Sequence, residues 1–122
     1  MFREIVAVFV GGGIGSIIRY LITKVSFFSY NSFPYSTFIS NIIGCFILGL
    51  ALTYFMKNDS QNSTIFIFIT VGFCGGFTTF STFSSEGLEL INNGNLITFI
   101  LYTFTSILLG IIAIYLGASI YK

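Results

Sequence analysis

One apolar stretch of this chain, residues 64–91, is interrupted at its centre by glycines and hydroxyl side chains. Three glycines and six hydroxyl groups fall within the fourteen residues Gly72-Phe73-Cys74-Gly75-Gly76-Phe77-Thr78-Thr79-Phe80-Ser81-Thr82-Phe83-Ser84-Ser85. Glycine inside a helix costs about 1 kcal/mol relative to alanine, and it lets the backbone leave the helical conformation and resume it. The sequence therefore predicts a broken helix at this point.

The composition places this break inside a membrane. The chain has 122 residues, of which 55% are hydrophobic and 7% charged, whereas a soluble domain carries about 25% charged residues. A hydrocarbon core about 30 Å thick needs about 20 apolar residues per helix, so this length allows about four spans. Broken backbone survives at membrane depth only inside protein or against water, because lipid offers no hydrogen-bond partners. The break is therefore a candidate functional site.

We predict an all-α integral membrane protein with one domain, residues 1–122, and four transmembrane helices. The expected spans are residues 5–23, 35–56, 64–91 and 96–121, the third broken near 75–79, with an interfacial loop over 25–34. A straight third span of 28 residues would be about 42 Å long, which exceeds the membrane core and favours two half-helices. The first half is expected to end near Cys74 or Gly75, and the second to begin near Thr79. Free carbonyls at the first end favour a cation, and free N–H groups at the second favour an anion.

The first two spans carry residues that need partners inside the membrane. Gly11 and Gly15 form a small-residue pair that lets another helix approach closely. Arg19 lies about one turn inside the membrane end, either as an interfacial anchor or as a cation at the mouth of an anion path. Asn41 must face another helix or water, because burying an unpaired amide costs roughly a few kcal/mol. It is either a bond between helices or a donor that lines a conduction path.

Aromatic and acidic residues follow the break. Phe80 and Phe83 are three residues apart and share a helix face. Two rings presented edge-on attract an anion weakly, because the ring edge is electropositive. In a chain with 16 phenylalanines, packing in a core is the competing interpretation. Glu86 and Glu89 lie toward the end of the third span and are expected near an aqueous mouth.

The fourth span carries a polar but uncharged stripe. Its members recur every four residues and are Thr98, Tyr102, Ser106 and Gly110. One hydroxyl is uninformative because it can bond its own helix, but a continuous stripe is typical of a wet or ion-facing surface.

The composition also excludes several classes of function. There is no histidine, and the two cysteines, Cys45 and Cys74, lie in apolar runs, so no metal-ligand cluster is predicted from side chains. The chain has no nucleotide-binding loop and no helix basic enough for nucleic acid. We therefore predict a protein that is not an enzyme and has no nucleic-acid partner.

Basic residues hardly favour one orientation in the bilayer. With four spans, one side carries Arg3, Lys57 and Lys122, and the other carries Lys24 and the shallow Arg19. This difference is too small for the positive-inside rule to favour one orientation. We predict a chain that inserts in both orientations and forms an antiparallel homodimer, with the two third-span breaks meeting near the midplane.

Three segments resemble the signatures of a known family. They are Gly11-Gly12-Gly13-Ile14-Gly15-Ser16-Ile17-Ile18-Arg19-Tyr20, Asn41-Ile42-Ile43-Gly44 and residues 72–84. Together they are similar to the first, second and third helices of the CrcB/Fluc fluoride channels, over the whole chain and in the same order. The third segment is the most specific of the three.

This resemblance implies a dual-topology antiparallel homodimer in the cytoplasmic membrane, with two fluoride pores and a structural Na⁺ at the dimer centre. By position, the backbone carbonyls of Gly75 and Thr78 would bind Na⁺. The implied pore residues are Asn41, Phe80, Phe83, Ser81, Thr82, Tyr102 and Ser106. Arg19 would lie at the vestibule and Glu86 near an aqueous entrance.

Three functions remain open on sequence alone. The first is a passive channel that exports fluoride and lowers its cytoplasmic level. The second is a small proton-coupled exporter resembling the small multidrug resistance transporters, which needs a titratable carboxylate inside the membrane. The acidic residues lie toward helix ends, which counts against the exporter. The third is a non-conducting membrane subunit, in which Phe80 and Phe83 only pack.

Overall fold

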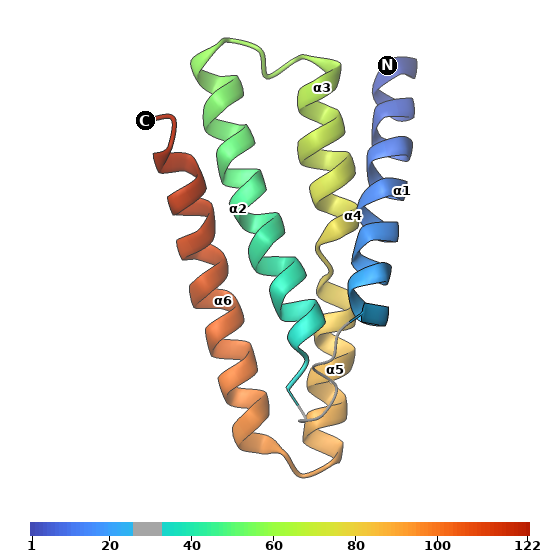
Figure 1. Ribbon diagram of the computed structural model, residues 1–122, viewed down its shortest axis with the longest axis vertical. Coiled ribbons are helices and arrows are strands. Elements are labelled where there is room, and N and C mark those ends of the chain that lie inside the picture. Colours follow the sequence, from blue (N-terminus) through green and yellow to red (C-terminus); the bar gives the residue numbers. More distant parts are fainter. Residues whose placement is uncertain (26–32) are drawn as a thin grey trace.

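The computed structural model describes residues 1–25 and 33–122, and these residues form helices joined by short turns (Figure 1). Four helical rods are long and apolar enough to cross a membrane. The first, second and fourth rods are α1 (Phe2–Val25), α2 (Tyr35–Lys57) and α6 (Leu96–Ser119). The third rod is broken and consists of α3 (Thr64–Ile67), η1 (Phe68–Cys74), α4 (Gly75–Phe77) and α5 (Phe80–Asn92). The all-helical fold, the four spans and the interruption of the third are confirmed. The expected loop after the first span falls largely outside the described residues.

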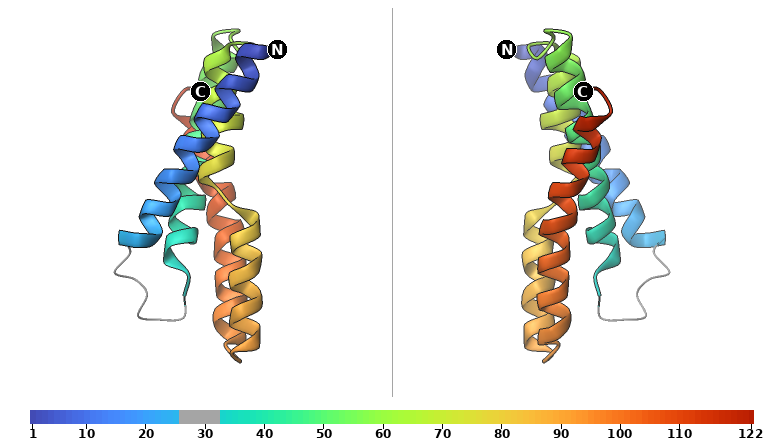
Figure 2. Two further views of the ribbon diagram at one scale, coloured as in Figure 1. Left: turned by 90° about the vertical axis from the view of Figure 1, so that its right-hand side faces the viewer. Right: turned by 90° about the vertical axis from the view of Figure 1, so that its left-hand side faces the viewer.

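Successive rods run in alternating directions, so both termini and the α2–α3 connection lie at one end of the molecule (Figure 1). α2 lies along α6, and the two run in the same direction. At one end the rings of Phe33 and Tyr102 are 5.3 Å apart, and at the other the Lys57 ammonium donates to the Tyr121 carbonyl over 3.1 Å. α1 packs instead against η1 and α4, and α5 packs against α6. As Figure 2 shows, the lower part of α1 therefore diverges from the α5–α6 pair.

The contact between α1 and the third rod is made backbone to backbone. A Cβ added to Gly15 would lie 2.8 Å from the Phe77 nitrogen, and one added to Gly76 would lie 2.9 Å from the Gly12 carbonyl carbon. Both distances are shorter than side-chain carbons tolerate, so only glycine fits at these positions. This contact fixes the first half of the broken rod against α1 and leaves its other side free to form a site.

The outer faces of the rods are apolar. Phe9, Ile17, Ile97 and Ile111 are each at least 60% exposed. Side chains of this kind are stable on the surface only in contact with hydrocarbon or with another protein. The chain is therefore a multi-pass membrane protein.

Candidate functional site

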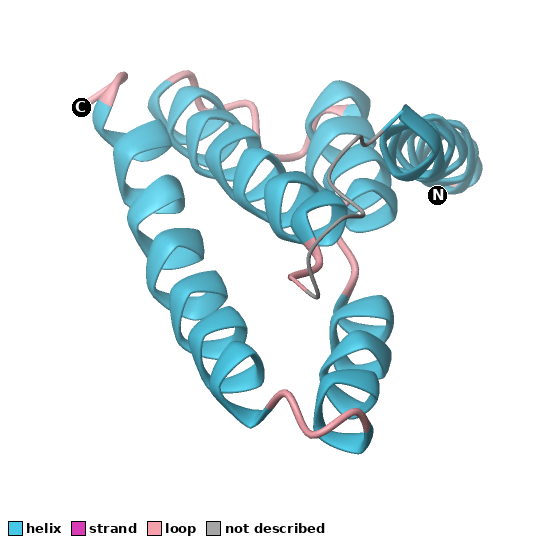
Figure 3. Cartoon of the chain, turned by 60° about the horizontal axis from the view of Figure 1, so that its bottom comes forward, coloured by secondary structure: helices cyan, strands magenta, loops and turns pink. Residues whose placement is uncertain are grey.

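The third rod is broken at Thr78 and Thr79, whose backbones are extended (φ −83°, ψ 157° and φ −152°, ψ 119°), and Figure 3 shows the loop between its two halves. α4 continues to Phe77, so Gly75 and Gly76 are still helical. The first half-helix therefore ends two or three residues later than expected, and Gly76 serves the close approach of α1. The second half begins with Thr79 as its N-cap, close to the predicted position.

Two carbonyl groups at the end of the first half-helix accept hydrogen bonds from side chains. The Thr78 amide and hydroxyl both donate to the Cys74 carbonyl, over 3.0 and 2.8 Å. The Gly76 carbonyl accepts from the Ser16 hydroxyl at 3.3 Å and from Nε of Arg19 at 3.2 Å. A guanidinium at the carbonyl end of a helix also complements the negative end of its dipole. Arg19 thus stabilises the break from the α1 side, and it does not line the cavity described below.

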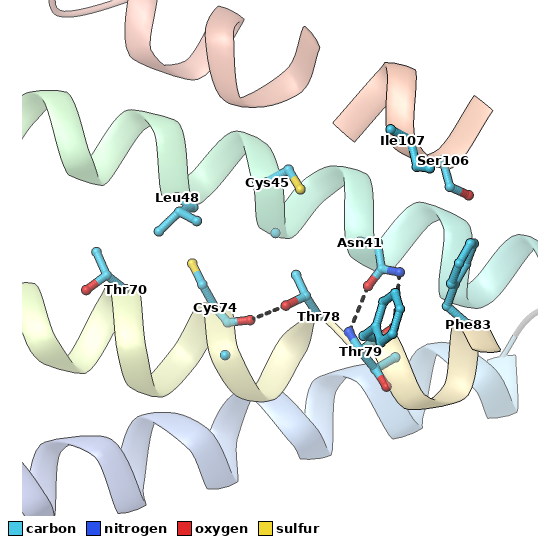
Figure 4. Close-up of a pocket in the computed structure, with 13 residues that line it drawn as sticks. Asn41, Cys45, Leu48, Thr70, Cys74, Thr78, Thr79, Phe83, Ser106 and Ile107 are labelled. Atoms are coloured by element: carbon cyan, nitrogen blue, oxygen red, sulfur yellow. Dashed lines mark hydrogen bonds between the residues drawn. The ribbon is translucent and has the colours of Figure 1, made fainter. Parts of the chain in front are cut away.

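Asn41 of α2 holds the start of the second half-helix (Figure 4). The Thr79 amide donates to Oδ1 of Asn41 over 2.8 Å, and Nδ2 of Asn41 donates back to the Thr79 carbonyl over 3.4 Å. The Thr79 hydroxyl accepts from the Thr82 amide at 3.2 Å, which is a side-chain N-cap. Asn41 is therefore a bond between helices, and it also faces the cavity.

These bonds leave two backbone carbonyls without their usual helical donors. In a continuous helix the Gly75 carbonyl would accept from the Thr79 amide, and the Thr78 carbonyl from the Thr82 amide. Here the first amide is given to Asn41 and the second to the Thr79 hydroxyl. Carbonyl oxygens freed at a broken helix are suitable ligands for a small cation such as Na⁺. Within residues 1–25 and 33–122, no group of three or more acidic, cysteine or histidine side chains offers another metal site.

A cavity of about 400 Å³ opens beside the break, between α2, the third rod and α6. It brings together six of the predicted site residues, Asn41, Gly75, Thr78, Phe80, Phe83 and Ser106. Figure 4 shows the side chains of Asn41, Phe83 and Ser106 gathered at one end of it. The rings of Phe80 and Phe83 lie 5.9 Å apart, as their spacing predicts, and Phe80 is 80% exposed. In this chain Phe80 is thus not a core side chain.

Glu86 and Tyr102 form a separate cluster with Thr37. Thr37 donates to one carboxylate oxygen of Glu86 and the Tyr102 hydroxyl donates to the other, each over 2.7 Å. Tyr102 and Thr37 are 0% and 2% exposed, and Glu86 is half-buried. The carboxylate expected near an aqueous mouth is thus held between α2 and α6 by two hydroxyl groups. The role of Thr37 as its partner was missed, because nothing local in the sequence links residues 49 positions apart.

The remaining predicted residues differ in how they are bonded. Ser81 is exposed, and Thr82 is bonded to the cap at Thr79. The Ser106 hydroxyl is buried, and the described residues offer it no hydrogen-bond partner. It is therefore free to donate toward the cavity that Ser106 lines. Thr79 was predicted as the start of the second half-helix but not as its N-cap, although a threonine directly before a helical run is a recognisable N-cap signal.

The sequence of this chain is similar to those of a known protein family. Residues 6–118 match the family described as CrcB-like protein, Camphor Resistance (CrcB). A fluoride-specific ion channel FluC of Azobacteroides pseudotrichonymphae is 40% identical over 118 residues, covering 96% of this chain and 94% of its own. Proteins of the same name from Flavobacterium psychrophilum and Phocaeicola vulgatus are 38% and 41% identical, covering 98% and 94% of this chain and 98% and 95% of theirs. Ion channels are not enzymes, in agreement with the sequence-based expectation. This chain belongs to the CrcB-like protein family.

Proposed function

We propose that this protein is a passive fluoride-selective channel that lets fluoride leave the cell and so lowers its cytoplasmic level. The observation that carries this proposal is the neutral lining of the cavity at the break, in a chain whose relatives are named fluoride-specific ion channels. The proposed path runs past the polar side chains of Asn41, Ser81, Thr82, Tyr102 and Ser106 and past the rings of Phe80 and Phe83. Arg19 is proposed to lie at the vestibule and Glu86 near an aqueous entrance.

Neutral donors suit this ion for a physical reason. Fluoride is small and strongly hydrated, so a selective path must replace its water with several hydrogen-bond donors without binding it too tightly to leave. Asn41 and Ser106 provide an amide and a free hydroxyl at the cavity, and the rings of Phe80 and Phe83 add weakly attractive edges. Arg19 and Glu86 do not line this cavity and are engaged in hydrogen bonds elsewhere.

The assembly we propose is an antiparallel, dual-topology homodimer in the cytoplasmic membrane, with two pores. The carbonyls of Gly75 and Thr78 would hold a structural Na⁺ where the two breaks meet. Such an ion supplies a positive charge that raises the local potential for an anion. The support is the loss of both helical donors at these carbonyls and the nearly even distribution of basic residues between the two ends.

Fluoride efflux from liposomes tests the channel directly. The purified protein should release fluoride as soon as valinomycin lets potassium follow, while chloride-loaded vesicles remain silent. The rate should depend on the membrane potential and not on a pH gradient, because a passive path couples to no proton. A fluoride electrode records both the rate and the extent of release. If liposomes with the correctly assembled protein released no fluoride, the proposal would be contradicted.

The Glu86→Gln variant serves to separate the channel from a proton-coupled exporter. Glutamine keeps one acceptor for Thr37 or Tyr102 but cannot titrate, so a channel should still pass fluoride without a pH gradient. An exporter would lose fluoride transport together with its proton flux. A non-conducting subunit, by contrast, would show no fluoride flux of its own, and substitution of Phe80 and Phe83 by isoleucine would change no ion flux.

Replacing sodium during purification tests the proposed cation. In buffers with N-methylglucamine as the sole cation, we expect a lower melting temperature than in sodium, because the carbonyls of Gly75 and Thr78 would then lack their ligand. Returning Na⁺ should restore the melting temperature, whereas the larger K⁺ should restore less of it. Equal melting temperatures in all three buffers would argue against a bound cation.

A further inference from the structure

The N-terminal part of α1 separates from the third rod and leaves a groove. The two backbones touch where their residues are small, since a Cβ on Gly72 would lie 3.0 Å from the Ala7 carbonyl oxygen. Toward the chain's start, larger side chains replace the small ones. A groove of about 500 Å³ opens there, lined by Phe2, Val6 and Val10 of α1 and by Ile65 and Phe68 of the third rod. Figure 1 shows this end of α1 beside α3 at the edge of the molecule.

The lining of this groove is almost wholly apolar, and its side chains are accessible. Val6 and Val10 are each 43% exposed and Ile65 is 63% exposed. Both walls are parts of rods that are long and apolar enough to cross a membrane, so the groove lies at the depth of the hydrocarbon. An apolar groove inside a bilayer is not filled by water, because its walls offer water no hydrogen bonds.

A positive charge without a partner marks the membrane end of the groove. Arg3 lines the groove and makes no ion pair or hydrogen bond within the described residues. The other basic side chains at this end are engaged, Lys57 with the Tyr121 carbonyl and Lys122 over the ring of Tyr115. The nearby carboxylate of Glu4 is 3.6 Å from the N-terminal ammonium group. Arg3 is thus the cation at this end that is free to receive an anion.

We propose that this groove binds one anionic glycerophospholipid, with an acyl chain between α1 and α3 and the phosphate at Arg3. The charge pattern selects this occupant, because a long apolar wall ending in an unpaired guanidinium complements a molecule with an apolar tail and an anionic head. Arg3 lies at the end of its span, which is the depth at which lipid phosphates lie. The proposal is independent of which ion the protein conducts.

Native mass spectrometry of the delipidated protein tests the proposal. The protein is offered equal amounts of palmitoyl-oleoyl phosphatidylglycerol and phosphatidylcholine, and the lipids retained per chain are counted. We expect one retained lipid per chain, with phosphatidylglycerol preferred about fivefold, as for one basic residue near an anionic surface. Arg3→Gln should keep the lipid and lose the preference. Val10→Phe should fill the groove and lose the lipid.

Matched variants control for charge and for bulk. Lys24→Gln removes a charge at the other end, and Ile17→Phe adds the same ring to an exposed position of α1 outside the groove; neither should change lipid retention. If Val10→Phe fails to fold, Val6→Phe provides the same obstruction at the neighbouring turn. A preference that survives Arg3→Gln would overturn the proposal, as would unchanged retention in both phenylalanine variants. Loss of the dimer in those variants, with lipid retention intact, would assign the groove to a second copy of the chain instead.

Discussion

Replacing Gly76 by alanine should prevent α1 from docking on the broken rod. The new Cβ would lie 2.9 Å from the Gly12 carbonyl carbon and Cα, and backbone atoms in a helix cannot turn aside as a flexible side chain can. α1 would have to move away, and the Gly76 carbonyl would lose its bonds from Ser16 and Arg19. Overpacking alone costs about 1–3 kcal/mol. The lost bonds, one of them to a charged donor, add about 2–4 kcal/mol. We therefore expect a melting temperature lower by 10 °C or more, or no folded protein, in detergent followed by circular dichroism.

Gly13→Ala is the matched control for this prediction. Gly13 is on the same helix as Gly12, and a Cβ at this position would meet nothing within 4 Å. Alanine is the better helix former, so this variant should melt at the wild-type temperature or slightly above it. If Gly76→Ala melted like Gly13→Ala, the backbone contact between α1 and the third rod would be wrong.

The same glycines show where sequence reasoning succeeds and where it stops. A long apolar run that is rich in glycine and hydroxyl groups predicts an interrupted span, and the span is interrupted. The break lies within the predicted residues 75–79, but the first half-helix continues past its expected end, because a glycine that permits a break and a glycine that permits close packing look alike in one sequence. Gly76 is used for packing. The chain breaks instead at two threonines, whose β-branched side chains suit extended backbone and whose hydroxyls replace helical bonds.

Long-range pairs could not be predicted for a different reason. The polar stripe of the fourth span, whose members recur every four residues, placed Tyr102 and Ser106 on one face, and both are directed toward the interior. Periodicity along one helix does not reveal that the Tyr102 hydroxyl is taken by Glu86, or that Arg19 bonds a carbonyl 57 residues away. Such partners depend on how whole helices cross. The candidate residues were therefore identified by type and spacing, whereas their separation into a cavity and a carboxylate cluster required the structure.

Substituting leucine for Asn41 should lower fluoride efflux by about a hundredfold. Leucine has the same branching and the same number of side-chain heavy atoms but can neither accept from the Thr79 amide nor donate to its carbonyl. A buried amide left unpaired costs about 1–3 kcal/mol, and the cavity loses its amide donor as well. If about 2.7 kcal/mol of this loss falls on the conducting state, the rate falls by about two orders of magnitude. The measurement is initial fluoride efflux per folded protein in liposomes, with the melting temperature taken in parallel.

The two readouts separate the two roles that the sequence leaves open for Asn41. A bond between helices acts mainly on stability. Asn41 bonds the backbone of Thr79, where α5 begins, so loss of this bond should appear as a lower melting temperature. Loss of a donor on the ion path lowers efflux even when the protein remains folded, since the wall of the path then offers the ion one polar group fewer. Asn58→Leu is the matched control, because Asn58 directly follows the same helix and is exposed, and its side chain donates to the Tyr54 carbonyl at 2.8 Å, outside the cavity. An Asn41→Leu protein that melts and conducts like Asn58→Leu would contradict both roles at once.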